Sequence, residues 1–107
     1  AIKTSSDARK KNSIEKLDNR YLNLIRSLVP RRFKYNDNST DRYHSGFIAQ
    51  ELQEKWKNAG LSYDELAALV DDGSELAIRY GEMIPLLLLY IRYLEDKLNK
   101  HLNERGA

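Results

Sequence analysis

The sequence predicts a single small α+β domain of 107 residues, in which a short antiparallel sheet packs with helices and one long helix ends the chain. Two apolar stripes at helical spacing favour the helices, one from Ile14 to Leu28 and the other from Ile84 to Leu98. Between them, short stretches that alternate polar and aromatic or β-branched residues are typical of strands. Clusters of Asn, Asp, Ser and Gly separate these stretches and predict turns.

The first helix is expected to begin at Asn12, which precedes Glu15 by three residues as in a capping box, and to end at Pro30. Asn58-Ala59-Gly60 is expected to end a second helix, and Asp71-Asp72-Gly73-Ser74 predicts a turn. That second helix is expected over 50–56, and short strands are expected over 32–35, 46–49 and 76–80. The residues expected in the core of this region are Phe47, Ile48, Leu52 and Trp56, with Tyr80 closing it from the last strand.

The chain is predicted to end in one long helix over about 81–104. Pro85 lies near its start, where a backbone N–H has no helical partner. Apolar residues then alternate three and four apart, which is typical of a coiled-coil seam. After Arg92 too little chain remains to cover this stripe, so a self-associating interface is expected. Its predicted members are Leu87, Ile91, Leu94 and Leu98.

Composition excludes several kinds of site. Charged residues make up 32% of the chain but the net charge is only +2, which disfavours a broad nucleic-acid-binding surface. There is no cysteine, so neither disulfides nor thiolate metal sites can form, and two separated histidines are too few for zinc. The longest apolar run is shorter than a bilayer span. No signal peptide is visible and the chain lacks a starting Met, so a processed fragment or an excised piece of a longer chain is expected.

A hydroxyl, an acid and a lysine stand together before the first helix, in the stretch from Ser6 to Lys11. A lysine with a neutral amine can take the proton of a serine hydroxyl, so this pair is a minimal apparatus for acyl transfer. Ser5 is a second candidate nucleophile and Lys10 a second candidate base. The alternative is an ordinary charged N-terminus.

Four separated motifs, in order, resemble the C-terminal intramolecular chaperone auto-processing domain of phage tail spikes, tail fibres and neck appendages. The resemblance covers nearly the whole chain, from Ser6 to about Leu98. The motifs are Ser6-Asp7-x-Arg9-x-Lys11-x-x-Ile14, Phe33-x-Tyr35, Gly46-Phe47-Ile48-Ala49-Gln50-Glu51, and Tyr80 with Pro85-Leu86-Leu87.

The resemblance implies a homotrimer that folds an upstream fibrous segment of the same polypeptide and then releases itself as a single-turnover serine endopeptidase. It implies Ser6 as nucleophile, Lys11 as general base, and the Ser6–Asp7 bond as the cleavage site. Residues 1–6 would end the upstream fibre, and residues 7–107 would form the chaperone. The expected setting is a phage tail precursor made in the host cytoplasm for host attachment, with no cofactor, metal, membrane or nucleic-acid partner.

Two questions stay open at this point. Attack by Ser6 on its own carbonyl needs a four-membered ring, whereas attack on the preceding carbonyl forms a five-membered ring and cuts before Ser6. Cleavage after Ser6 therefore calls for a bound water or the serine of another chain. The alternatives for the whole chain are a trimerisation or interaction module without cleavage, and a helical nucleic-acid-binding domain that the balanced charge disfavours.

Overall fold

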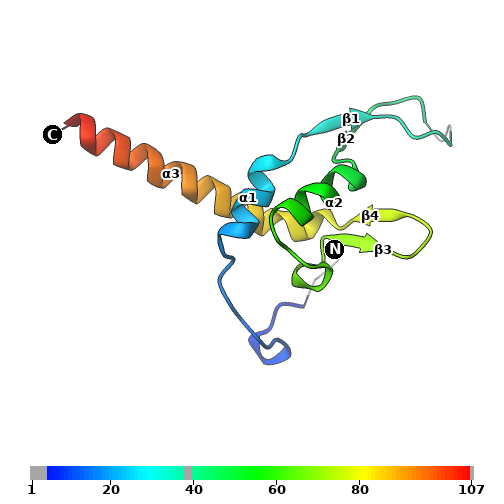
Figure 1. The fold of residues 1–107 in the computed structure, drawn as a ribbon, viewed down its shortest axis with the longest axis horizontal. Helices are drawn as coiled ribbons and strands as arrows, with labels where there is room; N and C mark the ends of the chain where they lie inside the picture. Colours follow the sequence, from blue (N-terminus) through cyan, green and yellow to red (C-terminus); the bar gives the residue numbers. More distant parts are fainter. Residues whose placement is uncertain (1–4, 38–39, 107) are drawn as a thin grey trace.

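The computed structural model describes residues 5–37 and 40–106, which form an α+β fold with two separate antiparallel hairpins and a long C-terminal helix (Figure 1). The α-helices are α1 (Asn19–Ser27), α2 (Ala49–Asn58) and α3 (Ile84–Gly106). The strands are β1 (Arg31–Phe33), β2 (His44–Gly46), β3 (Leu69–Asp71) and β4 (Leu76–Ile78). Short 3-10 turns are η1 (Ala8–Lys10), η2 (Tyr63–Glu65) and η3 (Tyr80–Met83).

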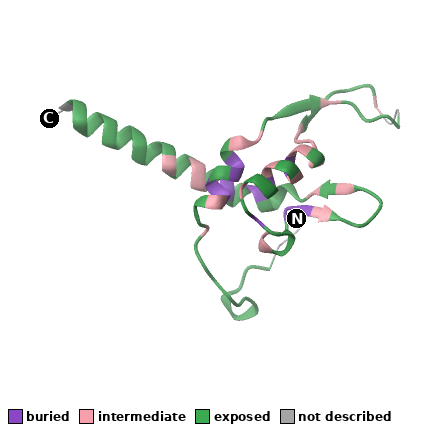
Figure 2. Cartoon of the chain, in the orientation of Figure 1, coloured by how far each residue is buried: buried purple, intermediate pink, exposed green. Residues whose placement is uncertain are grey.

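The core lies where α1, α2 and the first turns of α3 meet, and Figure 2 shows the buried residues gathered there. Leu24, Leu52 and Leu86 are fully buried, one from each helix. Trp56 is buried beside them, and its indole N–H donates to the carbonyl of Ser62 at 2.9 Å. The expected burial of Leu52 and Trp56 is confirmed, whereas Phe47 and Ile48 are only half-buried.

The first helix is shorter than the sequence predicts. It begins at Asn19, and Asp18 caps it by accepting a hydrogen bond from the backbone N–H of Arg20 at 2.9 Å. The expected start at Asn12 is wrong, because Ser13 takes a left-handed backbone conformation with φ of 52°. Ile14 is 74% exposed, so no packing supports a helix there.

The two hairpins join neighbouring strands only. In the first, Arg31 pairs with Gly46 and Phe33 with His44; part of its connecting loop, residues 38–39, lies outside the described residues. In the second, β3 pairs with β4 across the predicted Asp71–Ser74 turn. The single sheet of the sequence prediction is therefore two ribbons.

Tyr80 is not a strand residue, because β4 ends at Ile78 and Tyr80 begins η3. Its side chain is 46% exposed, and its hydroxyl accepts a hydrogen bond from the backbone N–H of Phe47 at 3.1 Å. Tyr80 thus ties the end of the first hairpin to the segment that leads into α3.

Helix α3 begins three residues later than predicted and runs out of the body of the molecule (Figure 1). Its first turns pack against α1, and most of the rest is exposed (Figure 2). Among residues 5–37 and 40–106, no helix is long and apolar enough to cross a membrane. Seven apolar side chains of α3 are 47–64% exposed: Ile84, Leu87, Leu88, Ile91, Leu94, Leu98 and Leu102.

Candidate functional site

The segment from Ser6 to Lys11 folds as one tight turn. Asp7 stands at the start of η1, and its carboxylate accepts a hydrogen bond from the backbone N–H of Arg9 at 2.9 Å. The carbonyl of Asp7 accepts from the N–H of Lys10 at 3.0 Å, and the carbonyl of Ala8 accepts from the N–H of Lys11 at 3.2 Å. These bonds reverse the chain, so the residues that flank the turn come close together.

Ser6 and Lys11 are in direct contact across this turn. The Nζ of Lys11 donates a hydrogen bond to the Oγ of Ser6 at 2.6 Å. This distance is within the range that a nucleophile and its general base require. Both side chains are exposed to solvent in the protomer. The structure therefore brings together the two residues proposed as catalytic, and the contact to Ser6 comes from Lys11.

Arg9 holds the carboxylate of Asp7 in a bidentate ion pair, which we call the Asp7–Arg9 clasp. Its Nε donates to Oδ1 of Asp7 at 3.1 Å and its Nη2 donates to Oδ2 at 2.7 Å. The side-chain hydrogen bond from Arg9, followed by the one from its backbone N–H, lowers the pKa of the Asp7 carboxyl. The ion pair of Arg9 with Asp7 was not predicted from the sequence; the available signal was the spacing of two residues between Arg9 and an acid that can cap a turn.

The turn lies apart from the helical core. Figure 1 shows the segment in dark blue below α1, joined to it by residues 12–18, which form neither helix nor strand. Within the described part of the chain, every hydrogen bond and ion pair of residues 6–11 stays inside the segment. A single protomer therefore builds the geometry of the Ser6–Lys11 pair but leaves it in water.

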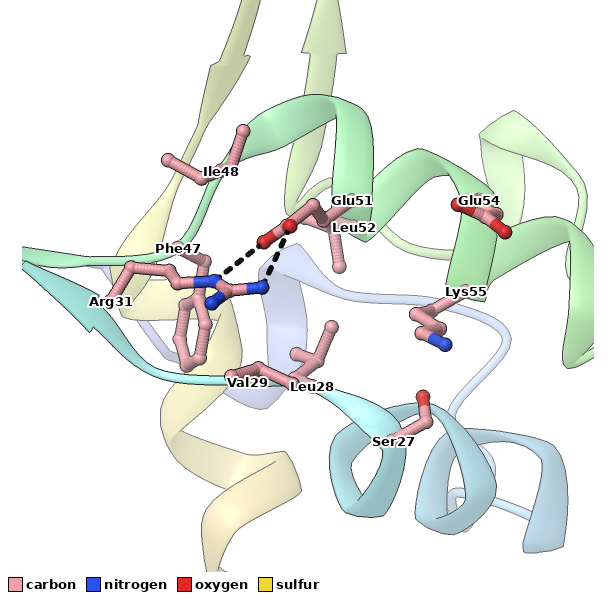
Figure 3. A pocket seen from close by; sticks show the side chains of 10 residues that line it. All are labelled: Ser27, Leu28, Val29, Arg31, Phe47, Ile48, Glu51, Leu52, Glu54 and Lys55. Carbon is pink, nitrogen blue, oxygen red and sulfur yellow. Dashed lines mark hydrogen bonds and ion pairs between the residues drawn. The ribbon is translucent and has the colours of Figure 1, made fainter.

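A separate cavity of about 170 Å³ lies between the end of α1 and the start of α2 (Figure 3). Leu28, Phe47 and Leu52 contribute apolar surface to it. Arg31 and Glu51 bridge it through two hydrogen bonds of 3.1 and 3.0 Å. Neither Ser6 nor Lys11 lines this cavity, and no group of acidic or histidine side chains able to hold a metal occurs among the described residues.

The predicted interface residues are remote from the turn within one protomer. Leu87, Ile91, Leu94 and Leu98 lie along α3, which projects away from the body on the side opposite the β3–β4 hairpin (Figure 1). These side chains are apolar and exposed, so a second copy of the chain could cover them. Their role in an interface stays a prediction. Any link between these residues and the Ser6–Lys11 pair requires more than one copy of the chain.

The chain is similar to a known protein family and to a solved structure. The model of a peptidase family described as "Chaperone of endosialidase" matches residues 6–61, just over half of the chain, and the match begins at Ser6. A solved structure described as "Crystal structure of a novel intramolecular chaperon" superposes with a TM-score of 0.71, covering 86% of this chain and 99% of that chain. The two are 21% identical, so this likeness shows a shared fold. No curated protein matches the chain.

Proposed function

This chain belongs to the peptidase family described as chaperone of endosialidase, and from that premise we propose that it is a self-releasing intramolecular chaperone. In this proposal it forms a homotrimer, aligns three copies of an upstream fibrous segment and then cuts itself free by Ser–Lys autoproteolysis. Removal of the chaperone leaves the fibre kinetically trapped, since refolding would need the lost domain. We place it in a phage tail fibre or spike precursor that is assembled in the host cytoplasm and later serves host attachment.

The contact between Lys11 Nζ and Ser6 Oγ, at 2.6 Å, is the observation that carries the proposed cleavage. A neutral Lys11 takes the hydroxyl proton of Ser6 while Oγ attacks a carbonyl carbon. The C–N bond then breaks, the lysine returns its proton to the leaving amine, and an ester to Oγ remains. Water hydrolyses this ester and restores the serine. The cut at Ser6–Asp7 follows if Oγ attacks the Ser6 carbonyl of another copy.

The exposure of the pair sets a condition on this chemistry. An ordinary lysine amine is protonated at neutral pH and is a poor base. Removal from water favours the neutral amine, and so does a neighbouring cation such as Lys10, whereas the charge of Arg9 is paired with Asp7. We therefore propose that a neighbouring copy covers the turn, so that trimerisation precedes the cut.

The experiment is intact-mass spectrometry of a chain that carries an upstream segment. The wild type should yield a product that begins at Asp7, and Ser6→Ala should remain full length. Lys11→Ala should abolish the cut, whereas the matched variant Lys10→Ala should slow it at most, because Lys11 makes the contact to Ser6. If Ser6→Ala is still cut at the same bond, Ser6 is not the nucleophile.

A second candidate function is a trimerisation module that does not cleave. The full exposure of the Ser6–Lys11 turn in the protomer favours it, because nothing in one copy shields the amine from water. A wild-type chain that is trimeric and folds its upstream segment, yet keeps its full mass, would establish this second function.

A further inference from the structure

The Asp7–Arg9 clasp occupies the carboxylate that adjoins the proposed nucleophile. Arg9 donates three hydrogen bonds to Asp7: from its backbone N–H at 2.9 Å and its Nε at 3.1 Å, both to Oδ1, and from its Nη2 at 2.7 Å to Oδ2. Both oxygens of Asp7 are therefore taken by one residue. Arg9 stands two residues before Lys11, the partner of Ser6.

A free carboxylate at position 7 would compete with Ser6 for Lys11. Asp7 follows Ser6 directly, so its carboxylate is the acid next to the Ser6 hydroxyl in the chain. An ammonium binds a carboxylate more strongly than a neutral hydroxyl. Such a pair would draw Lys11 away from Ser6 and would also favour its protonated form. Either effect removes a general base.

We infer that Arg9 is a positioning residue for the Ser6–Lys11 pair, which it serves by occupying Asp7 and leaving Lys11 directed at Ser6. This inference rests on the proposed autoproteolysis. The charged side chains around Lys11 in the turn are Asp7, Arg9 and Lys10, and no described residue of another element makes an ion pair or hydrogen bond with them. Arg9 therefore acts through Asp7, because its charge is paired with that carboxylate and keeps it from Lys11.

A double-mutant cycle separates this role from a purely structural one. The four chains are the wild type, Arg9→Ala, Asp7→Asn and the double variant. Asparagine caps a turn as aspartate does but carries no charge. Removal of Arg9 should slow cleavage about three- to fivefold at neutral pH while Asp7 is present, and shift the rising limb of the pH–rate profile upward by roughly half a unit. In the Asp7→Asn background the same removal should change neither the rate nor the profile.

The state of Lys11 can be read independently of cleavage. Trace labelling with acetic anhydride reports how much of each amine is neutral, and peptide mass spectrometry reads Lys11 against Lys10 in the same molecule. Arg9→Ala should lower the relative labelling of Lys11 about three- to fivefold, and Asp7→Asn should restore it. Arg9→Lys keeps the charge with fewer donors, so its labelling should lie between those of the wild type and Arg9→Ala.

The outcomes distinguish the inference from the function on which it rests. A wild type that keeps its full mass contradicts autoproteolysis, and the labelling still decides whether Arg9 keeps Asp7 from Lys11. Equal losses of rate and labelling with Asp7 present and in the Asp7→Asn background would overturn the inference, because Arg9 would then only support the turn. Unchanged rates and labelling in Arg9→Ala would also overturn it. A thermal unfolding curve for each variant verifies that the helical core is intact.

Discussion

Replacing Leu94 with glutamate should convert a trimer into monomers. Leu94 lies on the exposed apolar stripe of α3, and its side chain is 49% exposed in the protomer. In a three-stranded seam the three copies of position 94 would meet in one layer. The substitution would therefore place three carboxylates together in an apolar contact.

The size of the effect follows from the exposure of the stripe. Full burial of a Leu or Ile side chain stabilises by about 1.5–3 kcal/mol, so covering the exposed half of one contributes roughly 1 kcal/mol. Four such residues in each of three chains give roughly 12 kcal/mol, which is comparable to the cost of association at about 4–15 kcal/mol. Each unpaired buried carboxylate costs several kcal/mol. Three of them exceed any surplus that the seam provides. The four residues are Leu87, Ile91, Leu94 and Leu98.

Light scattering after size-exclusion chromatography, at chain concentrations from micromolar upward, measures the result. Asn103→Glu is the matched control, because it adds the same charge to α3 nine residues along, on the opposite face of the helix. The control should stay trimeric while Leu94→Glu becomes monomeric. A wild type that is monomeric throughout the range would refute the reasoning, and so would a trimeric Leu94→Glu.

The same variant tests whether the cut follows assembly. If a neighbouring copy provides the dry environment for the Ser6–Lys11 turn, monomeric Leu94→Glu should keep its full mass, although position 94 is far from Ser6. Two further predictions concern the fold. A Cβ at Gly46 would overlap the hydroxyl oxygen of Tyr80. Gly46→Ala should therefore lower the free energy of unfolding, measured in urea, by about 1–3 kcal/mol, and by less in a Tyr80→Phe background. If the losses of the two variants are strictly additive, this overlap is not the cause. Backbone N–H groups in the β3–β4 turn lower the pKa of Asp72 to about 2. The contribution of this carboxylate to stability is therefore present above about pH 4 and is lost as the pH falls toward 2. In Asp72→Asn the free energy of unfolding should depend less on pH over that window, and an unchanged slope would argue against this role.

Two helices and one turn could be predicted from local patterns in the sequence. The second helix and the long last helix were predicted from apolar residues at helical spacing, and the turn at 71–74 from its turn motif; the structure has all three. The Asn12–Glu15 spacing was locally as good a start signal, yet the first helix starts at Asn19. The difference is that Ile14 has no surface to pack against, and a capping pattern alone does not hold a short helix in water.

Contacts between distant segments account for most of what the sequence did not predict. Tyr80 continues an alternating pattern and suggested a strand, but its hydroxyl binds the backbone of Phe47, 33 residues earlier. Nothing in the local spacing of either residue indicates that pairing. The Ser6–Lys11 contact is the opposite case, because a five-residue spacing closed by a capped turn is entirely local. The proposed site was therefore easier to predict than the arrangement of the two hairpins.

The local origin of the Ser6–Lys11 pair bears on how premature cleavage could be avoided. Six consecutive residues supply the nucleophile, the amine and the clasp, so this geometry does not depend on the helical core or on other copies. Assembly cannot then be needed to bring the pair together. What assembly can add is the Ser6 carbonyl of another copy, removal of water from the amine, and hydrogen-bond donors for the oxyanion that forms during attack. If the proposed cut waits for the trimer, its control lies in the environment of a pair that is already formed. The assembled interface would then control when cleavage begins, and the chaperone would be released only after three copies of the upstream segment have been brought together.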